Sequence, residues 1–109
     1  MKSFTTAKKR RDPLEFTLDE DTPKERTLRF VPQKVSGMVM DLFDDDDESK
    51  PPAKAAMDWL SDGLSEEDND YLIARLKDPE DDFDFPDLGR IVKWLVGEVT
   101  GRPTGPRRG

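Results

Sequence analysis

The chain has no cysteine and no histidine among its 109 residues, and only 33% of these residues are hydrophobic. The lack of cysteine excludes disulfides, thiolate metal sites and a thiol nucleophile. The lack of histidine removes the commonest general base and a common zinc ligand. No apolar run approaches the ~20 residues that a transmembrane helix needs, and the basic start leads into acidic sequence, not into the apolar region of a secretory signal. We therefore expect no membrane association and a single domain with a small core.

Negative charge is what the chain has in excess, and it is unevenly distributed. Residues 12–101 hold all 25 acidic residues against ten basic ones, a net charge of −15 for this part. The ends are basic, so we interpret residues 1–12 and 102–109 as disordered basic tails and residues 13–101 as one domain. An acidic body repels phosphate backbones, which predicts no nucleic-acid binding through it. It also attracts basic partners and suppresses self-association.

Apolar and polar residues alternate at the start of the domain. Leu14, Phe16 and Leu18 alternate with polar residues, and a second alternating run ends at Pro32. This period of two predicts a β-hairpin over 14–31. Because a lone two-stranded ribbon is marginal in water, one face of the hairpin must lie on helices.

Apolar residues at helical spacing predict four helices in the rest of the domain. Ser65 followed by acidic residues is typical of an N-cap, and the dipeptide Asp78-Pro79 is typical of a helix end. Gly101 before Pro103 predicts the end of the last helix. The expected helices are about 33–43, 52–63, 66–77 and 86–100. The predicted fold class is therefore α+β, mainly α, with an N-terminal β-hairpin packed on a bundle of about four short helices.

The apolar stripes of the first and last helices exceed what a short hairpin can cover. We therefore hypothesise that surplus apolar surface on these helices contacts a partner. Core packing and partner binding are left equally open for Phe83 and Trp94, whereas Phe85 is expected to pack on the core. The candidate partner-binding residues are Val35, Met38, Leu42, Phe83, Leu88, Ile91, Trp94, Leu95 and Val99.

The acidic runs do not fit a metal or catalytic site. Asp44, Asp46 and Glu48 have the spacing of the first half of a calcium loop, but Ser49 stands where the turn glycine is needed, and Ala55 where the bidentate acid is needed. Paired carboxylates would need a cleft that desolvates one of them, and a core this small is not expected to enclose one. We therefore expect no metal, no cofactor and no enzymatic activity.

The order of the segments resembles that of the tail assembly chaperones of long-tailed bacteriophages, especially those infecting actinobacteria. The resemblance covers residues 14–106 and includes A-x-x-x-M-D-W-L-x-x-x-L-S-E-E-D from Ala53 and L-x-x-R-L-x-D-P from Leu72. The chain departs from the family in its long aspartate run and in its Gly-Pro-Arg-Arg-Gly ending. The family-motif residues are Asp78, Pro79, Gly101, Arg102, Pro103 and Thr104.

The resemblance implies a protein that binds the long, mostly helical tape measure protein, keeps it soluble and helps recruit tail tube protein around it. It implies action in the host cell cytoplasm during assembly, and absence from the mature virion. It also implies an extended isoform made by programmed frameshifting, with the present length fitting the short form.

Two alternatives remain open at this point. One is an acidic nucleic-acid mimic that inhibits a host DNA-binding enzyme, which would need carboxylates on a rigid face at about one charge per 1.7 Å. Many acids of this chain lie in proline-flanked segments, which disfavours that rigidity. The other alternative is a structural head or tail connector that stays in the particle.

Overall fold

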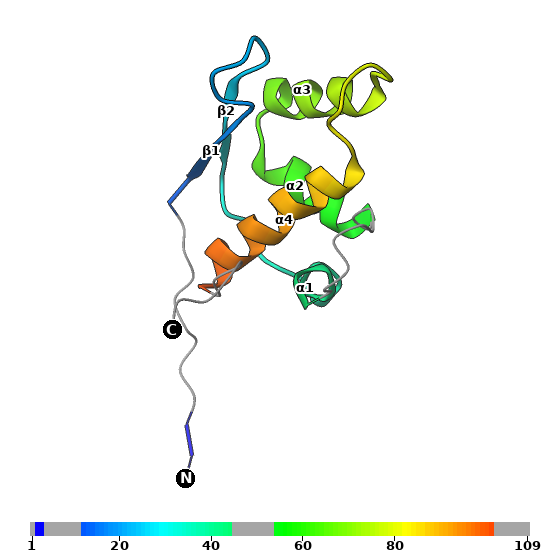
Figure 1. Ribbon diagram of the computed structural model, residues 1–109. Helices are drawn as coiled ribbons and strands as arrows, with labels where there is room; N and C mark the ends of the chain where they lie inside the picture. The colour runs from blue at the N-terminus through cyan, green and yellow to red at the C-terminus, as the bar shows by residue number, and fades with distance from the viewer. Residues whose placement is uncertain (1, 4–11, 45–53, 102–109) are drawn as a thin grey trace, which may run out of the picture.

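A computed structural model describes residues 2–3, 12–44 and 54–101, as a two-stranded antiparallel hairpin followed by four helices (Figure 1). This confirms the predicted fold class, α+β and mainly α. The predicted tails fall almost wholly outside the described residues, so their disorder stays a prediction. The elements are β1 (Leu14–Leu18), β2 (Arg26–Phe30), α1 (Gly37–Asp44), α2 (Lys54–Gly63), α3 (Glu66–Lys77) and α4 (Phe85–Thr100).

The hairpin occupies the predicted stretch, with Leu14 opposite Phe30 and Leu18 opposite Arg26. β1 ends at Leu18, because Asp19 has a positive φ of 49° and begins the turn. Aspartate tolerates this left-handed conformation better than most residues. One face of the hairpin is buried, whereas the residues between, such as Glu15 and Thr17, are exposed.

Local end signals define α3 and α4. The Ser65 side chain accepts a hydrogen bond from the amide of Asp68, and α3 occupies the predicted 66–77. Asp84 and Asp87 form a capping box at the start of α4, and Gly101 ends the helix with a φ of 75°. A glycine is favoured there because other residues pay a steric cost at such angles.

The first helix begins later than predicted, at Gly37 and not near residue 33. Ser36 Oγ accepts a hydrogen bond from the amide of Val39 at 3.3 Å, as an N-cap side chain does. The carbonyls of Gln33 and Lys34 instead accept from the Trp59 indole N–H, at 3.3 and 3.0 Å. These contacts attach the preceding segment to α2, so it does not join the helix.

The core lies where α4 packs against α1 and α2 and where β2 meets α2 (Figure 1). The Phe30 ring lies 4.7 Å from that of Trp59, measured between centroids. A Cβ on Gly63 would lie 2.2 Å from the Phe30 ring, so only glycine allows this approach. The buried apolar residues are Leu14, Leu28, Phe30, Val39, Ala56, Trp59, Leu60, Leu64, Leu72, Phe83, Leu88, Val92, Leu95, Val96 and Val99.

The prediction that Phe85 packs on the core is wrong. Phe85 is 42% exposed, because it stands at the first residue of α4, outside that helix's buried stripe. On α3, Ile73 is 36% exposed, whereas its neighbour Leu72 is buried.

Candidate functional site

The predicted partner-binding residues do not form one surface. Phe83, Leu88, Leu95 and Val99 are all buried in the core, with Leu95 fully covered. For Leu88, Leu95 and Val99 the hypothesis of surplus surface is wrong, because these residues of α4 pack against the other elements.

The other predicted partner-binding residues lie in two separate regions, one around α1 and one on α4. Met38 is 67% exposed on α1, while Val35 packs half-buried against the core before that helix. The side chain of Leu42 lies outside what the structure describes. Ile91 and Trp94 are partly buried on α4, and both line a groove.

This groove lies between β1 and the first half of α4 and has a volume of about 470 Å³. Its apolar wall includes an edge-to-face contact of the Phe16 and Trp94 rings, with centroids 6.1 Å apart at 68°. The groove brings together three of the predicted residues, Phe83, Ile91 and Trp94. Its lining residues are Phe16, Thr17, Leu18, Asp19, Arg75, Asp82, Phe83, Asp87, Arg90, Ile91 and Trp94.

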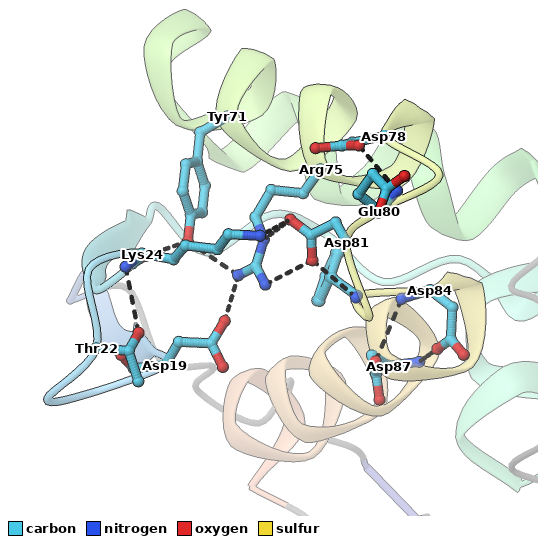
Figure 2. A network of polar contacts seen from close by, with 11 residues as sticks. Asp19, Thr22, Lys24, Tyr71, Arg75, Asp78, Glu80, Asp81, Asp84 and Asp87 are labelled. Carbon is cyan, nitrogen blue, oxygen red and sulfur yellow. Dashed lines mark hydrogen bonds and ion pairs between the residues drawn. The ribbon is translucent and has the colours of Figure 1, made fainter.

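Arg75 lines the groove and is the centre of a polar cluster. Figure 2 shows its side chain reaching from α3 between the hairpin turn and the loop that joins α3 to α4. Two parallel hydrogen bonds of 2.9 Å join Arg75 Nε and Nη2 to the two carboxylate oxygens of Asp81. Arg75 Nη1 forms an ion pair with Asp19 and donates to the Tyr71 hydroxyl at 3.1 Å. The guanidinium also lies 5.0 Å from the centroid of the Phe83 ring.

The cluster fixes the hairpin turn to α3 and to the following loop. The Tyr71 hydroxyl donates to the carbonyl of Lys24 at 2.9 Å, and Lys24 Nζ lies 3.1 Å from Asp81 Oδ2 (Figure 2). Asp81 Oδ1 also accepts from the amide of Phe83 at 2.9 Å, which helps to place that ring in the core. Arg75 therefore connects the hairpin turn, which is distant in the sequence, to α3 and to the loop that follows α3.

Hydrogen bonding within the cluster shifts the pKa values of both central groups. The Arg75 hydrogen bonds, followed by the Phe83 amide, hold the pKa of Asp81 well below its usual range. Hydrogen bonds to Asp81 raise the pKa of Arg75. Both side chains are thus charged at any pH near neutrality.

A second ion pair attaches β2 to α3. Arg26 Nε and Nη2 both lie 2.9 Å from Asp68 Oδ1, and the amide of Arg29 donates to Asp68 Oδ2 at 3.3 Å. Asp68 is only 7% exposed, so its carboxylate is satisfied mainly by the hairpin. Sequence analysis identified Asp68 only as a helix-start acid.

Sequence analysis also missed the role of Arg75 and Asp81. Arg75 stands inside the L-x-x-R-L-x-D-P motif, which was its only signal, and Asp81 was one acid among several in an acidic loop. The family-motif residues Asp78 and Gly101 lie at the ends of α3 and α4. Arg102, Pro103 and Thr104 fall outside the described residues.

The groove offers non-covalent contacts. Within residues 2–3, 12–44 and 54–101, no three acidic side chains are arranged to hold a metal ion. In the same ranges no helix has the length and hydropathy to cross a membrane. The groove combines aromatic and aliphatic side chains with fixed charges, a composition typical of polypeptide-binding surfaces.

Comparisons with known proteins complete the description of the site. Neither the models of protein families, nor the curated proteins, nor the solved structures contain a match to this chain.

Proposed function

We propose that this protein is a phage tail assembly chaperone, a non-enzymatic protein that binds the tape measure protein and keeps it soluble. The proposal starts from the sequence motifs over residues 14–106. The observation that carries it is the open groove between β1 and α4, where Phe16, Ile91 and Trp94 form an apolar surface on an acidic molecule.

An apolar groove on an acidic molecule is suited to keeping an aggregation-prone polypeptide soluble. A tape measure protein carries long apolar stripes, and such stripes aggregate unless a partner covers them. An apolar groove covers part of the stripe, and the net charge of −15 over residues 12–101 adds repulsion between complexes. The proposal includes recruitment of tail tube protein, action in the host cytoplasm, absence from the mature virion and an extended frameshifted isoform.

Co-expression with a tape measure fragment tests the proposal. We expect the fragment to stay soluble and to co-purify with the wild-type chain. Trp94→Ala should reduce the recovered complex severalfold, because Trp94 supplies the largest ring of the groove. Phe85→Ala is the matched control, since Phe85 is exposed on the same helix but does not line the groove. A fragment that precipitates equally with and without the chaperone would contradict the proposal.

Two further measurements address the alternatives. Capture of a host nuclease or polymerase, in place of a tail protein, would favour the nucleic-acid mimic. Abundant chain in purified virions, measured by mass spectrometry, would favour a structural connector.

A further inference from the structure

β1 has one paired edge and one open edge. Within residues 2–3, 12–44 and 54–101 the sheet has two strands, so among these residues β1 pairs with β2 on one side alone. Three consecutive strand residues, Phe16, Thr17 and Leu18, line the groove. Because neighbouring strand residues point to opposite faces, such a run indicates that the edge of the strand, and not one face alone, borders the groove.

The contacts of β2 show which of its backbone groups turn away from β1. The amide of Arg29 donates to Asp68 Oδ2 at 3.3 Å, and the amide of Val31 donates to the carbonyl of Gly63 at 2.8 Å. These amides point outward to α3 and α2 and are not available to β1. Odd-numbered residues of β2 therefore stand in the non-hydrogen-bonded pairs of the ladder, since the two kinds of pair alternate.

The pairing register shows which residues of β1 stand in the same non-hydrogen-bonded pairs. Glu15 lies opposite Arg29, and Thr17 lies opposite Thr27, so both belong to non-hydrogen-bonded pairs. Their N–H and C=O groups must point outward from the open edge. None of these four groups has a hydrogen-bond partner among the described parts of the chain. An open strand edge of this kind is a ready template for a further strand.

The side chains beside this edge restrict which polypeptide segments can bind there. Phe16 and Leu18 of the hairpin face Ile91 and Trp94 of α4 across the groove, so the inward side chains of an added strand would meet apolar surface. Outward side chains would lie near Glu15, which makes no ion pair within the described ranges.

The charges that line the groove favour a basic occupant. Arg90 is paired with Asp87, and Arg75 is paired with Asp81 and Asp19. Asp82 has no basic partner in the part of the chain that the structure describes. The positive charges are thus already neutralised, and the acidic groups that remain attract cations.

We propose that the groove binds an extended segment of a partner protein, which adds as a third strand to the open edge of β1. The segment alternates apolar side chains, which enter the groove, with lysine or arginine side chains, which lie outside it near Glu15. Main-chain hydrogen bonds to Glu15 and Thr17 give affinity, and the groove gives selectivity. The inference rests on the proposed function, because it takes the partner to be a polypeptide. It adds that the bound segment of the partner is extended, and is therefore bound before that segment becomes helical.

Defined peptides test this mode of binding with the full-length chain. The probe is a peptide of about ten residues that alternates valine and lysine, a length that spans one strand pair. We expect it to change the fluorescence of Trp94, and we expect no signal in Trp94→Phe. A peptide of the same composition with helical spacing, and an alternating peptide N-methylated on the pairing edge, should each bind about tenfold more weakly or not at all.

A pair of substitutions at Thr17 tests the edge itself. Thr17→Pro removes the outward amide, at a place where an edge strand tolerates proline, and should weaken binding about tenfold. Thr17→Val keeps the amide and should bind like the wild type. Should Thr17→Pro fail to fold, as judged by circular dichroism, the N-methylated peptide against the wild-type chain still decides the question.

The outcomes separate this inference from the proposed function. Equal binding of the alternating and N-methylated peptides overturns the inference, as does a dimer of the wild-type chain that Thr17→Pro abolishes, since the edge would then serve a second copy. A tape measure fragment that co-purifies equally with Thr17→Pro and wild type also overturns it, but leaves the proposed function standing. If the wild type binds the alternating peptide but no tape measure fragment, the inference stands and the proposed function fails.

Discussion

Two of the contacts that attach the hairpin to the helices are of opposite kinds. At its base, Phe30 packs on Trp59 and against the backbone of Gly63, in the apolar core. At its turn, Asp19 and Lys24 are held by the charged groups around Arg75. Apolar packing needs no partner charge and does not depend on pH, whereas the turn depends on every member of a polar cluster. The two attachments should therefore respond differently to mutation and to acid.

A substitution at the base of the hairpin should cause the largest loss of stability. Phe30→Ala removes a fully buried ring and leaves a cavity beside Trp59, which should lower the free energy of unfolding by about 3–5 kcal/mol. Urea unfolding followed by tryptophan fluorescence measures this change. The loss should be the same at pH 7 and pH 4.5, since the ring packs on Trp59 and Gly63, which do not titrate. If Phe30→Ala lowered the free energy of unfolding less than Asp81→Asn does, this ranking would be contradicted.

A substitution in the polar cluster at the hairpin turn should cause a smaller loss of stability, and this loss should depend on pH. Arg75 lowers the pKa of Asp81 in the folded state, so the stabilisation is fully present above the unfolded pKa of about 4. It is lost as the pH falls from there through the lower folded pKa. Asp81→Asn should thus lower the melting temperature at neutral pH, and the difference from wild type should shrink below about pH 4.

Thermal unfolding by circular dichroism between neutral and strongly acidic pH checks this expectation. The control is Asp82→Asn, which removes the neighbouring carboxylate, for which the described residues provide no ion pair. It should leave the melting temperature close to that of wild type. A difference between Asp81→Asn and wild type that stays constant into strong acid would show that the carboxylate charge is not what stabilises the turn.

The two attachments also differ in how far the sequence predicts them. Periodicity and local signals predict elements well: Ser65 and Asp78-Pro79 define α3 over 66–77, because caps and breakers act within a few residues. The groove and the Arg75 cluster were not predicted, because they join residues far apart in the chain and many acids are equally plausible partners for one arginine. The α4 stripe was recognised, but its spacing does not reveal whether other elements cover it.

An exposed ion pair on α2 tests whether burial accounts for the strength of the Arg75–Asp81 pair. Lys54 Nζ lies 2.9 Å from Asp58 Oδ2 on α2, the same separation as in the Arg75–Asp81 pair, and the two side chains are 87% and 62% exposed. Hydrogen bonding to Asp58 raises the pKa of Lys54. Water and salt nevertheless screen exposed charges, and holding two long side chains in place costs entropy.

Lys54→Ala should therefore leave the melting temperature unchanged within error. Alanine is also the better helix former, and a positive charge in the first described turn of α2 opposes the helix dipole. These small gains offset the lost ion pair, so the variant and wild type should coincide at both low and high salt. If Lys54→Ala destabilised the chain as much as Asp81→Asn, burial would not be what distinguishes the two pairs. A double variant with Asp58→Ala would then measure their coupling directly.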